Sequence, residues 1–437
     1  SIRRQRQMCI RDRYLLLLFT ISGNYQLQAQ SCKEDIKQKL QDPAIETLYA
    51  KTFHSLLDRM DHTNGYLPES LTGAYIGMYP RTTGAFVFLL METGHYDLAE
   101  LNLRYVLESV KANGLERIPH VLEKGMRIHS DEHQIDGQAH VILGWARLAL
   151  ARGVTAFEEE TWPIVSKLMT RTCDRTFFQY GSWSIEPGLI RNIAFEHSRD
   201  FRRWDVWDLL TQCFVGAALT DMIKVAARHN SPQLIADWTQ KRQILSEGIN
   251  KHLVVQRDGL PTYAEMMLPN GNGGDTYHGM GWVTLSPIAA GWCTDTAIVR
   301  NTVAYMNRHF LQTTNGIRWM PTDIYPDGSF INEVIGKGIG WELDFARTEN
   351  DFKRVLEILE LIKASNAGKD IYMEFAWLEG DGYKHNDRIT KEDALKMKDM
   401  KWTSRDAGNG EQSSWWCWAM ARLRKAVGLP ARPIQME

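Results

Sequence analysis

Apolar residues recur at intervals of three and four positions along most of the chain, which is the spacing of one face of an α-helix. The pattern predicts pairs of helices joined by short turns, over residues 80–93 and 95–113, 132–152 and 156–172, 203–229 and 232–252, 282–291 and 294–310, and 338–345 and 351–364. A first helix over 44–60 and a last helix over 413–427 complete a sixth pair. Period-two alternation is scarce, so extended segments are expected only near 253–263 and 317–329.

The two helices of each pair differ in their apolar surface. One helix is apolar on nearly all sides, as in the run Ala-Phe-Val-Phe-Leu-Leu over 85–90, whereas its partner has a single apolar stripe. An inner ring of buried helices inside an outer ring of amphipathic helices explains this difference. We therefore predict an all-α fold, an (α/α)6 toroid, as a single domain over residues 30–437. The loops that enter the inner helices then meet at one end of the ring.

Residues 1–29 are predicted to be a leader. The first thirteen residues resemble translated sequencing-adapter read-through and carry no fold information. The apolar run 14–21 follows Arg11 and Arg13 and is followed by Leu27-Gln28-Ala29, which is the pattern of a signal peptide cut after Ala29. The run is too short to span a bilayer. We expect a secreted or periplasmic protein without a membrane span.

Composition favours a carbohydrate ligand. Lys plus Arg number 51 and Asp plus Glu number 53, without a long run of one sign, so no nucleic-acid partner is expected. The chain contains 15 Trp, and many of them lie beside Gly, Asp or Asn instead of within apolar runs. Flat aromatic faces stack on sugar rings, so an oligo- or polysaccharide is the expected partner.

The stretch 189–227 places charged and aromatic residues directly before a long apolar helix. Hydrolysis of a glycosidic bond needs two carboxyl groups, roughly 6.5–9.5 Å apart for inversion and about 5–5.5 Å apart for retention. Glu196 is the preferred acid, because the apolar residues 193–195 before it would raise its pKa. Asp208 and Asp205 are alternatives, although both also suit a helix N-cap or first turn.

Two glutamates are candidates for the base. Glu411 follows the flexible turn 408–410 and comes directly before an inner helix. Glu374 is flanked by apolar residues, where a carboxylate is costly unless it is used or paired.

The order of these motifs resembles that of the glucoamylase-type six-hairpin glycoside hydrolases. Tyr79-Pro80-Arg81-Thr82 is similar to the family's aromatic-x-Arg-Asp segment, whose Arg and Asp hold the terminal sugar, although Thr82 stands where that Asp is expected. Asp136-Gly137-Gln138 is similar to its Asp-Gly-Pro segment, and Glu411-Gln412 to the Glu-Gln at its general base. The loop 196–208 occupies the place of its general acid. The resemblance implies a toroid that hydrolyses a terminal sugar.

Substrate-binding residues are expected in the loops that enter the inner helices. They are Tyr79, Arg81, His133, Asp136, Gln138, Arg199, Trp204, His278, Trp282, Trp341 and Trp415. Arginine binds carboxylates through paired hydrogen bonds, so Arg191, Arg199, Arg202 and Arg203 favour a uronic acid, as in a glucuronidase-type enzyme. Alternatively, these arginines neutralise the nearby aspartates.

No metal or cofactor is predicted. The segment 129–133 has histidines four positions apart but no third ligand nearby, and the loop 381–387 lacks the order of a calcium loop. Two other classes remain open. A polysaccharide lyase would use Tyr and His, with Tyr79, His197 and His278 as candidates. A non-catalytic glycan-binding protein would bind sugar without turnover.

Overall fold

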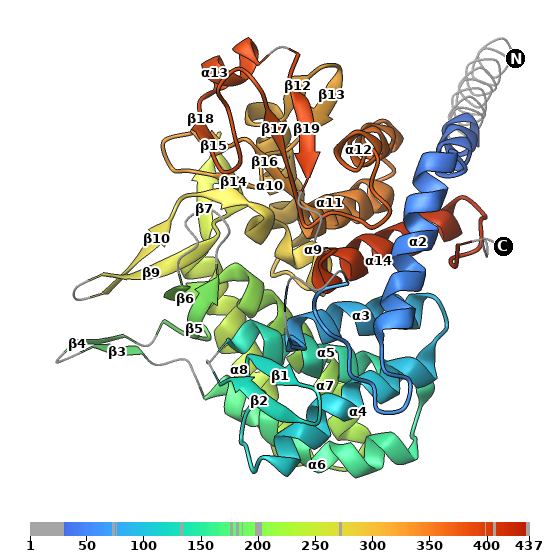
Figure 1. The fold of residues 1–437 in the computed structure, drawn as a ribbon. Helices are drawn as coiled ribbons and strands as arrows, with labels where there is room; N and C mark the ends of the chain where they lie inside the picture. The colour runs from blue at the N-terminus through green and yellow to red at the C-terminus, as the bar shows by residue number, and fades with distance from the viewer. Residues whose placement is uncertain are drawn as a thin grey trace, which may run out of the picture.

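The computed structural model describes residues 30–71, 75, 77–131, 134–174, 178–180, 183–185, 187–196, 203–270, 273–397, 399–404 and 408–433. The predicted leader over 1–29 lies outside these ranges. The inner helices are α3 (Pro80–Glu92), α5 (Ile135–Arg152), α7 (Leu209–Arg228), α9 (Ser286–Ala290), α11 (Gly336–Thr348) and α14 (Gly410–Ala426). Each packs on the next in this order, and α14 closes the ring against α3 (Figure 1). The predicted (α/α)6 toroid is confirmed.

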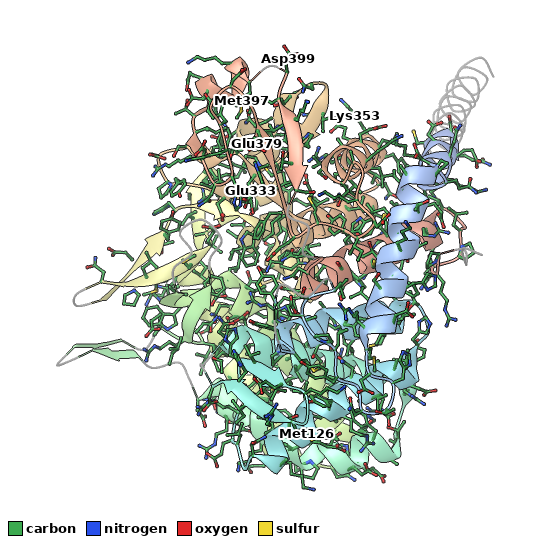
Figure 2. The ribbon with its side chains drawn as sticks, in the orientation of Figure 1. Met126, Glu333, Lys353, Glu379, Met397 and Asp399 are labelled. Atoms are coloured by element: carbon green, nitrogen blue, oxygen red, sulfur yellow. The ribbon has the colours of Figure 1, made fainter. Side chains whose placement is uncertain are left out.

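A second set of helices surrounds this ring. They are α2 (Pro43–Arg59), α4 (Tyr96–Ala112), α6 (Ala156–Cys173), α8 (Pro232–His252), α10 (Thr296–His309) and α12 (Phe352–Ser365). Residues 85–90 of α3 are all buried, whereas α4 buries mainly the stripe that contains Leu103, Val106 and Val110. The two helices of this pair therefore show the difference in apolar surface from which the rings were predicted. Figure 2 shows the side chains that fill the space between these elements.

Helix α7 is the one helix in the described part of the chain that is long and apolar enough to cross a membrane. Its apolar window is 78% buried, as expected for a helix of the inner ring.

Several predicted helix boundaries were wrong. The helix predicted from residue 203 begins at Leu209, because Arg203–Asp208 form strand β6, whose buried residues run into the helix without a break in hydrophobicity. The helix predicted from 132 begins at Ile135. The predicted helix over 282–291 consists of a 3-10 turn, η1 (Trp282–Leu285), followed by the short α9.

The structure contains more strands than predicted. The extended segments expected near 253–263 and 317–329 are confirmed as β7 (Val254–Arg257), β8 (Leu260–Tyr263), β13 (Ile317–Trp319) and β14 (Asp323–Ile324). The other strands are β1 (Val121–Glu123), β2 (Arg127–Ser130), β3 (Phe178–Tyr180), β4 (Trp183–Ile185), β5 (Asn192–Glu196), β9 (Met266–Asn270), β10 (Gly273–Tyr277), β11 (Met280–Gly281), β12 (Gln312–Thr314), β15 (Phe330–Ile331), β16 (Glu333–Ile335), β17 (Phe375–Glu379), β18 (Arg388–Ile389) and β19 (Lys401–Ser404). They are too short for alternation to stand out in the sequence.

Two of the small sheets lie at the entrance to the ring, which is the end where the inner helices begin. One has the strand order β10-β9-β6-β5 and the other β16-β17-β19. Strand β6 runs directly into α7, and β16 runs directly into α11. The sheets therefore hold the loops at the end where the inner helices begin. A short helix, α13 (Lys391–Lys396), lies outside this arrangement of rings and sheets.

Close packing of α3 on α5 depends on Gly84. A Cβ at this position would lie 2.5 Å from the Cβ of His140 and 2.7 Å from its backbone. We expect Gly84→Ala to lower the free energy of unfolding by about 1–3 kcal/mol, because neither helix backbone can yield at this crossing. Urea unfolding with Gly137→Ala as control checks this, since a Cβ at Gly137 would meet its nearest neighbour at an ordinary 3.5 Å. Equal losses in the two variants would contradict the prediction.

Candidate active site

The inner helices arrange polar and aromatic side chains in two layers. Asp136, Lys337 and Glu411 lie in the first turns of α5, α11 and α14. Side chains four positions apart share one face of a helix, so the next layer is formed one turn deeper. At these i+4 positions lie His140, Trp341 and Trp415. A charged layer thus covers an aromatic layer.

Arg81, Asp136, Lys337 and Glu411 make up the charged layer. The Nε of Arg81 lies 3.4 Å from Oδ2 of Asp136 and 3.7 Å from Oε2 of Glu411. The Nζ of Lys337 donates to both oxygens of Glu411, at 3.1 and 3.3 Å. Each cation is therefore in contact with a carboxylate.

Burial acts to raise the pKa values of Asp136 and Glu411, but neighbouring charges outweigh it. Arg81 and His140 lower the pKa of Asp136, and Lys337 and Arg81 lower that of Glu411. Lys337 is itself buried, and burial lowers its pKa. The layer therefore holds two ionised carboxylates against two cations.

A buried amide connects the charged layer to Asp208 at the start of α7. The Nδ2 of Asn192 donates to Oδ1 of Asp136 at 3.0 Å and to Oδ2 of Asp208 at 3.2 Å. Asp208 also caps α7, accepting from the backbone nitrogen of Thr211 at 2.6 Å and from its hydroxyl at 2.8 Å. Complete burial, followed by the charge of Asp136, raises the pKa of Asp208 to about 7. Asp208 can therefore carry a proton near neutral pH.

Glu374 lies directly before β17 and has different partners. The hydroxyl of Tyr75 donates to its two carboxylate oxygens at 3.1 and 3.0 Å, and the amide of Asn409 lies 3.5 Å from Oε1. Because Asn409 is the N-cap of α14, Glu374 is held beside the same inner helix that carries Glu411. Glu374 is 7% exposed.

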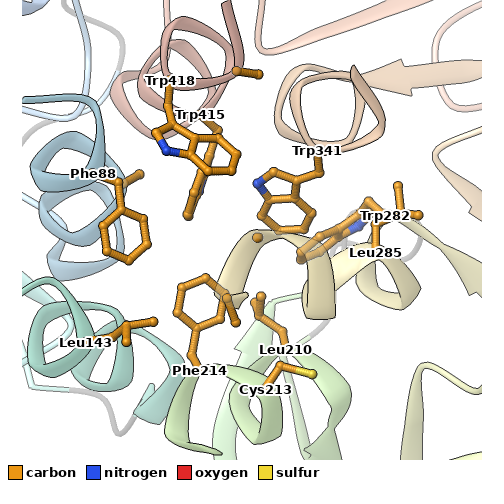
Figure 3. Packing of buried hydrophobic residues seen from close by; sticks show 14 of the residues in the cluster. Phe88, Leu143, Leu210, Cys213, Phe214, Trp282, Leu285, Trp341, Trp415 and Trp418 are labelled. Atoms are coloured by element: carbon orange, nitrogen blue, oxygen red, sulfur yellow. The ribbon is translucent and has the colours of Figure 1, made fainter. Parts of the chain in front are cut away.

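The aromatic layer lies one turn deeper than these charges and forms a floor, and Figure 3 shows the rings of Trp341, Trp415 and Phe214 within it. Trp415 meets Trp341 edge to face with ring centroids 5.5 Å apart, and His140 stacks on Phe214 at 3.5 Å. Both indoles lie one turn below the charged layer and are completely buried, so a sugar that stops at the charged layer cannot reach them, and the substrate-binding function predicted for Trp341 and Trp415 was wrong. The i+4 position places each ring below the first turn. The same correction applies to Trp282, which is buried with the Nζ of Lys337 lying 3.9 Å from its ring centroid.

Gln138 points away from the charged layer. Its side chain accepts from the backbone nitrogen of Ile118 and donates to the hydroxyl of Thr172 on the outer helix α6. The predicted sugar-binding function of Gln138 was therefore wrong. Two positions after Asp136, a helix has turned by more than half a circle, so the two side chains face opposite directions.

The remaining predicted residues are dispersed. Tyr79 immediately precedes α3 and packs edge to face on His120, with centroids 5.2 Å apart. His278 is exposed, and its carbonyl accepts from Arg257. Glu196 is the last residue of β5 and is paired with Arg203 of β6. The structure describes only the backbone of Glu196.

For Trp204 and Arg203 too, only the backbone is described. His133, His197 and Arg199 lie outside the described residues. The predictions made for these residues stay predictions.

Sequence reasoning missed four residues of the site: Glu69, Tyr75, Asn192 and Lys337. Lys337 had a usable signal, because it stands between glycines and isoleucines in Ile-Gly-Lys-Gly-Ile, where an ammonium group is costly unless it is paired. The other three lie in irregular or strand segments and carry no periodic signal.

The arrangement of rings defines the class of protein as an (α/α)6 toroid, and known toroids can be compared with it. A bacterial glucoamylase in complex with acarbose has a TM-score of 0.61 and 12% identity over 88% of this chain. An α-mannosidase from Streptococcus pneumoniae has a TM-score of 0.60 and 14% identity, covering 90% of this chain and 97% of its own. A rhamnosidase from Klebsiella oxytoca has a TM-score of 0.53 and 12% identity, covering 86% of this chain and 63% of its own.

These likenesses show the fold alone, and they confirm the predicted resemblance to glucoamylase-like glycosidases at that level. The chain spans 56% of the length of the glucoamylase. No family model and no curated protein matches the chain.

Proposed function

We propose that the protein is an exo-acting glycoside hydrolase that removes a terminal sugar from an oligo- or polysaccharide. The observation that carries this proposal is the pair of buried carboxyl groups in unlike environments at the entrance to the ring, Asp208 and Glu374. Burial beside Asp136 allows Asp208 to keep a proton, whereas Glu374 accepts hydrogen bonds from Tyr75 and Asn409. Acid and base catalysis by two carboxyl groups requires this difference.

Asp208 is the proposed acid in preference to Glu196, because the contacts of Asp208 join it to the charged layer. Glu374 is the proposed base in preference to Glu411. Two cations contact Glu411 and lower its pKa, which makes it a weaker proton acceptor and a suitable partner for sugar hydroxyls.

The two groups stand on opposite sides of the ring. Asp208 begins α7 and Glu374 is bonded to the N-cap of α14, and these two helices are opposite members of the inner ring. Asp208 would protonate the glycosidic oxygen while Glu374 takes a proton from a water molecule that attacks the anomeric carbon from the other face. The leaving sugar departs as an alcohol, and the configuration at the anomeric carbon is inverted.

Exo action is supported by the closed floor. The aromatic layer fills the ring beneath the charged layer (Figure 3), so a polysaccharide cannot pass through the toroid. A chain end that enters from the loops would stop at Arg81, Asp136, Lys337 and Glu411. These side chains can share hydrogen bonds with the hydroxyls of one sugar ring.

The charges of the described residues favour a neutral hexose. The predicted preference for uronic acid depends on arginines near residues 196–208, and Arg191 is bonded to Asp205 at 2.7 Å. Arg199 and Arg202 lie outside the described residues. In the charged layer the two carboxylates neutralise the two cations, so no surplus positive charge is left to bind a sugar carboxylate. A neutral sugar also agrees with the glucoamylase and the α-mannosidase that share the fold.

A substrate panel tests the proposal. It combines p-nitrophenyl α- and β-glycosides of glucose, mannose and rhamnose with glucuronides and with neutral and uronic oligosaccharides. Release of a saturated monosaccharide is expected. Products that absorb in the ultraviolet would show a lyase instead, and binding without turnover would show a glycan-binding protein. If the protein hydrolyses only the glucuronides, its substrate contains a uronic acid and the preference for a neutral hexose is wrong.

Activity should decline above neutral pH. The pKa of Asp208 is raised to about 7, so the protonated acid is present below that pH and is lost as the pH rises through it. We expect the rate constant kcat to fall about tenfold per pH unit on this alkaline limb, as for any required general acid. A pH profile of kcat between 4 and 9 checks this. A flat profile up to pH 9 would contradict Asp208 as the proton donor.

A further inference from the structure

Glu69 connects the two helices that carry Arg81 and Glu411. It is 4% exposed and lies in the segment between α2 and α3. Its carboxylate accepts from the hydroxyl of Thr82 in the first turn of α3 and from the backbone nitrogen of Glu411, at 3.3 Å, in the first turn of α14. The backbone adds a further bond, because the nitrogen of Gly410 donates to the carbonyl of Glu69 at 2.6 Å.

These bonds act next to the proposed sugar-binding contacts. Thr82 directly follows Arg81, and Glu411 is held through its own backbone nitrogen. The Nε of Arg81 lies 3.7 Å from Oε2 of Glu411, and within the part of the chain that the structure describes no backbone hydrogen bond joins α3 directly to α14. The side chain of Glu69 is bonded to both first turns, so it is placed where it can set this separation.

We propose that Glu69 is a positioning residue that sets the separation of Arg81 and Glu411 and, through them, the affinity for the terminal sugar. The second part rests on the proposed hydrolase function. The first part concerns the geometry of the protein alone and holds or fails separately.

The charges around Glu69 agree with this function. The anionic groups that face it are Glu411 and Glu374, and the cations Arg81 and Lys337 are in contact with Glu411. Burial, followed by the charge of Glu411, raises the pKa of Glu69 to about 8. Near neutral pH Glu69 therefore carries a proton. It can hold both helices without adding a third negative charge to the balanced charged layer.

The experiment compares Glu69→Gln, Glu69→Ala and Thr82→Val with the parent protein. The matched control is Glu92→Gln. The ion pair between Glu92 and Lys425 also joins α3 to α14, but at the C-terminal ends of the two helices. With p-nitrophenyl α-D-mannopyranoside and α-D-glucopyranoside as probes, Glu69→Ala and Thr82→Val should raise KM at least tenfold and change kcat less. Glu69→Gln, which keeps the shape and the hydrogen bonds, should stay within threefold of the parent, as should Glu92→Gln.

A pH series of melting temperatures gives a readout that does not depend on activity. Folded Glu69 keeps its proton between its ordinary pKa of 4.5 and about 8, whereas the unfolded chain loses it. The parent should therefore lose stability relative to Glu69→Gln as the pH rises from about 5 to 8, and this difference should level off above pH 8.

Two results would overturn the proposal. An unchanged KM in Glu69→Ala would overturn the effect on affinity, and a crystal structure of Glu69→Ala in which Arg81 and Glu411 keep their separation would overturn the positioning function. If the parent hydrolyses neither probe, the hydrolase proposal fails for these sugars, and the crystal structure together with the pH series still decides whether Glu69 joins the two helices.

Discussion

Glu374→Gln is expected to lower kcat by about 10³-fold while leaving KM within a few-fold of the parent, since positioned acid–base groups contribute typically 10²–10⁴-fold. The amide keeps the size of the side chain and a carbonyl oxygen that accepts from Tyr75, but it cannot take a proton from water. Single-turnover hydrolysis of the best substrate in the panel measures the loss.

Glu379→Gln is the matched control for this substitution. Glu379 lies at the other end of β17, the strand that Glu374 directly precedes, but it is exposed and bonded to Thr403 (Figure 2). Its loss should leave kcat unchanged. If Glu411→Gln abolishes turnover through kcat and Glu374→Gln does not, then Glu411 is the base, as the glycine-rich turn before it first indicated. If Glu411→Gln acts mainly on KM, Glu411 holds the sugar.

Asp208→Asn should lower kcat by at least about 10²-fold, because the amide cannot donate the proton that the leaving oxygen requires. Asparagine is as good an N-cap as aspartate, so the loss of stability should not exceed about 2 kcal/mol. Activity would then be lost from a folded protein. Substrates with an activated leaving group, such as p-nitrophenol, should lose less activity than natural disaccharides because they need less protonation.

Asp351→Ala separates this effect from helix capping. Asp351 caps α12 by accepting from the backbone nitrogen of Arg354, just as Asp208 accepts from Thr211 in α7. Removal of this carboxylate should lower the free energy of unfolding by about 0.5–2 kcal/mol without loss of turnover.

Glu196→Gln belongs in the same series of variants. Loss of activity in Glu196→Gln, with Asp208→Asn still active, would return the acid to the position that the sequence first favoured.

The sequence located the candidate site more accurately than it described the site. Arg81, Asp136 and Glu411 were predicted from motifs at the heads of inner helices, and the structure brings these three together. The tryptophans were misassigned because their position beside polar residues was taken as a sign of exposure. Trp415 and Trp341 stand at i+4 from Glu411 and Lys337, which places them in the floor.

The sequence by itself determined the pairs of helices and their division into an inner and an outer ring. A helix buries the same face at every turn, so its apolar residues recur with a helical period along the sequence. It also placed Arg81, Asp136 and Glu411 near the heads of inner helices, although it set the starts of α5 and α7 too early. Each of these properties depends on residues that are close together in the sequence, and many residues carry the same signal.

Only the tertiary structure decided the partners of the charged groups. Tyr75 donates to Glu374 from 299 positions away, and Lys337 contacts Glu411 from 74 positions away. Closing the ring brings the first turns of distant helices to one entrance, and the pattern within one helix contains no information about its neighbours. The pKa values of Glu69 and Asp208 follow from the same cause, because they depend on burial and on carboxylates that other helices supply.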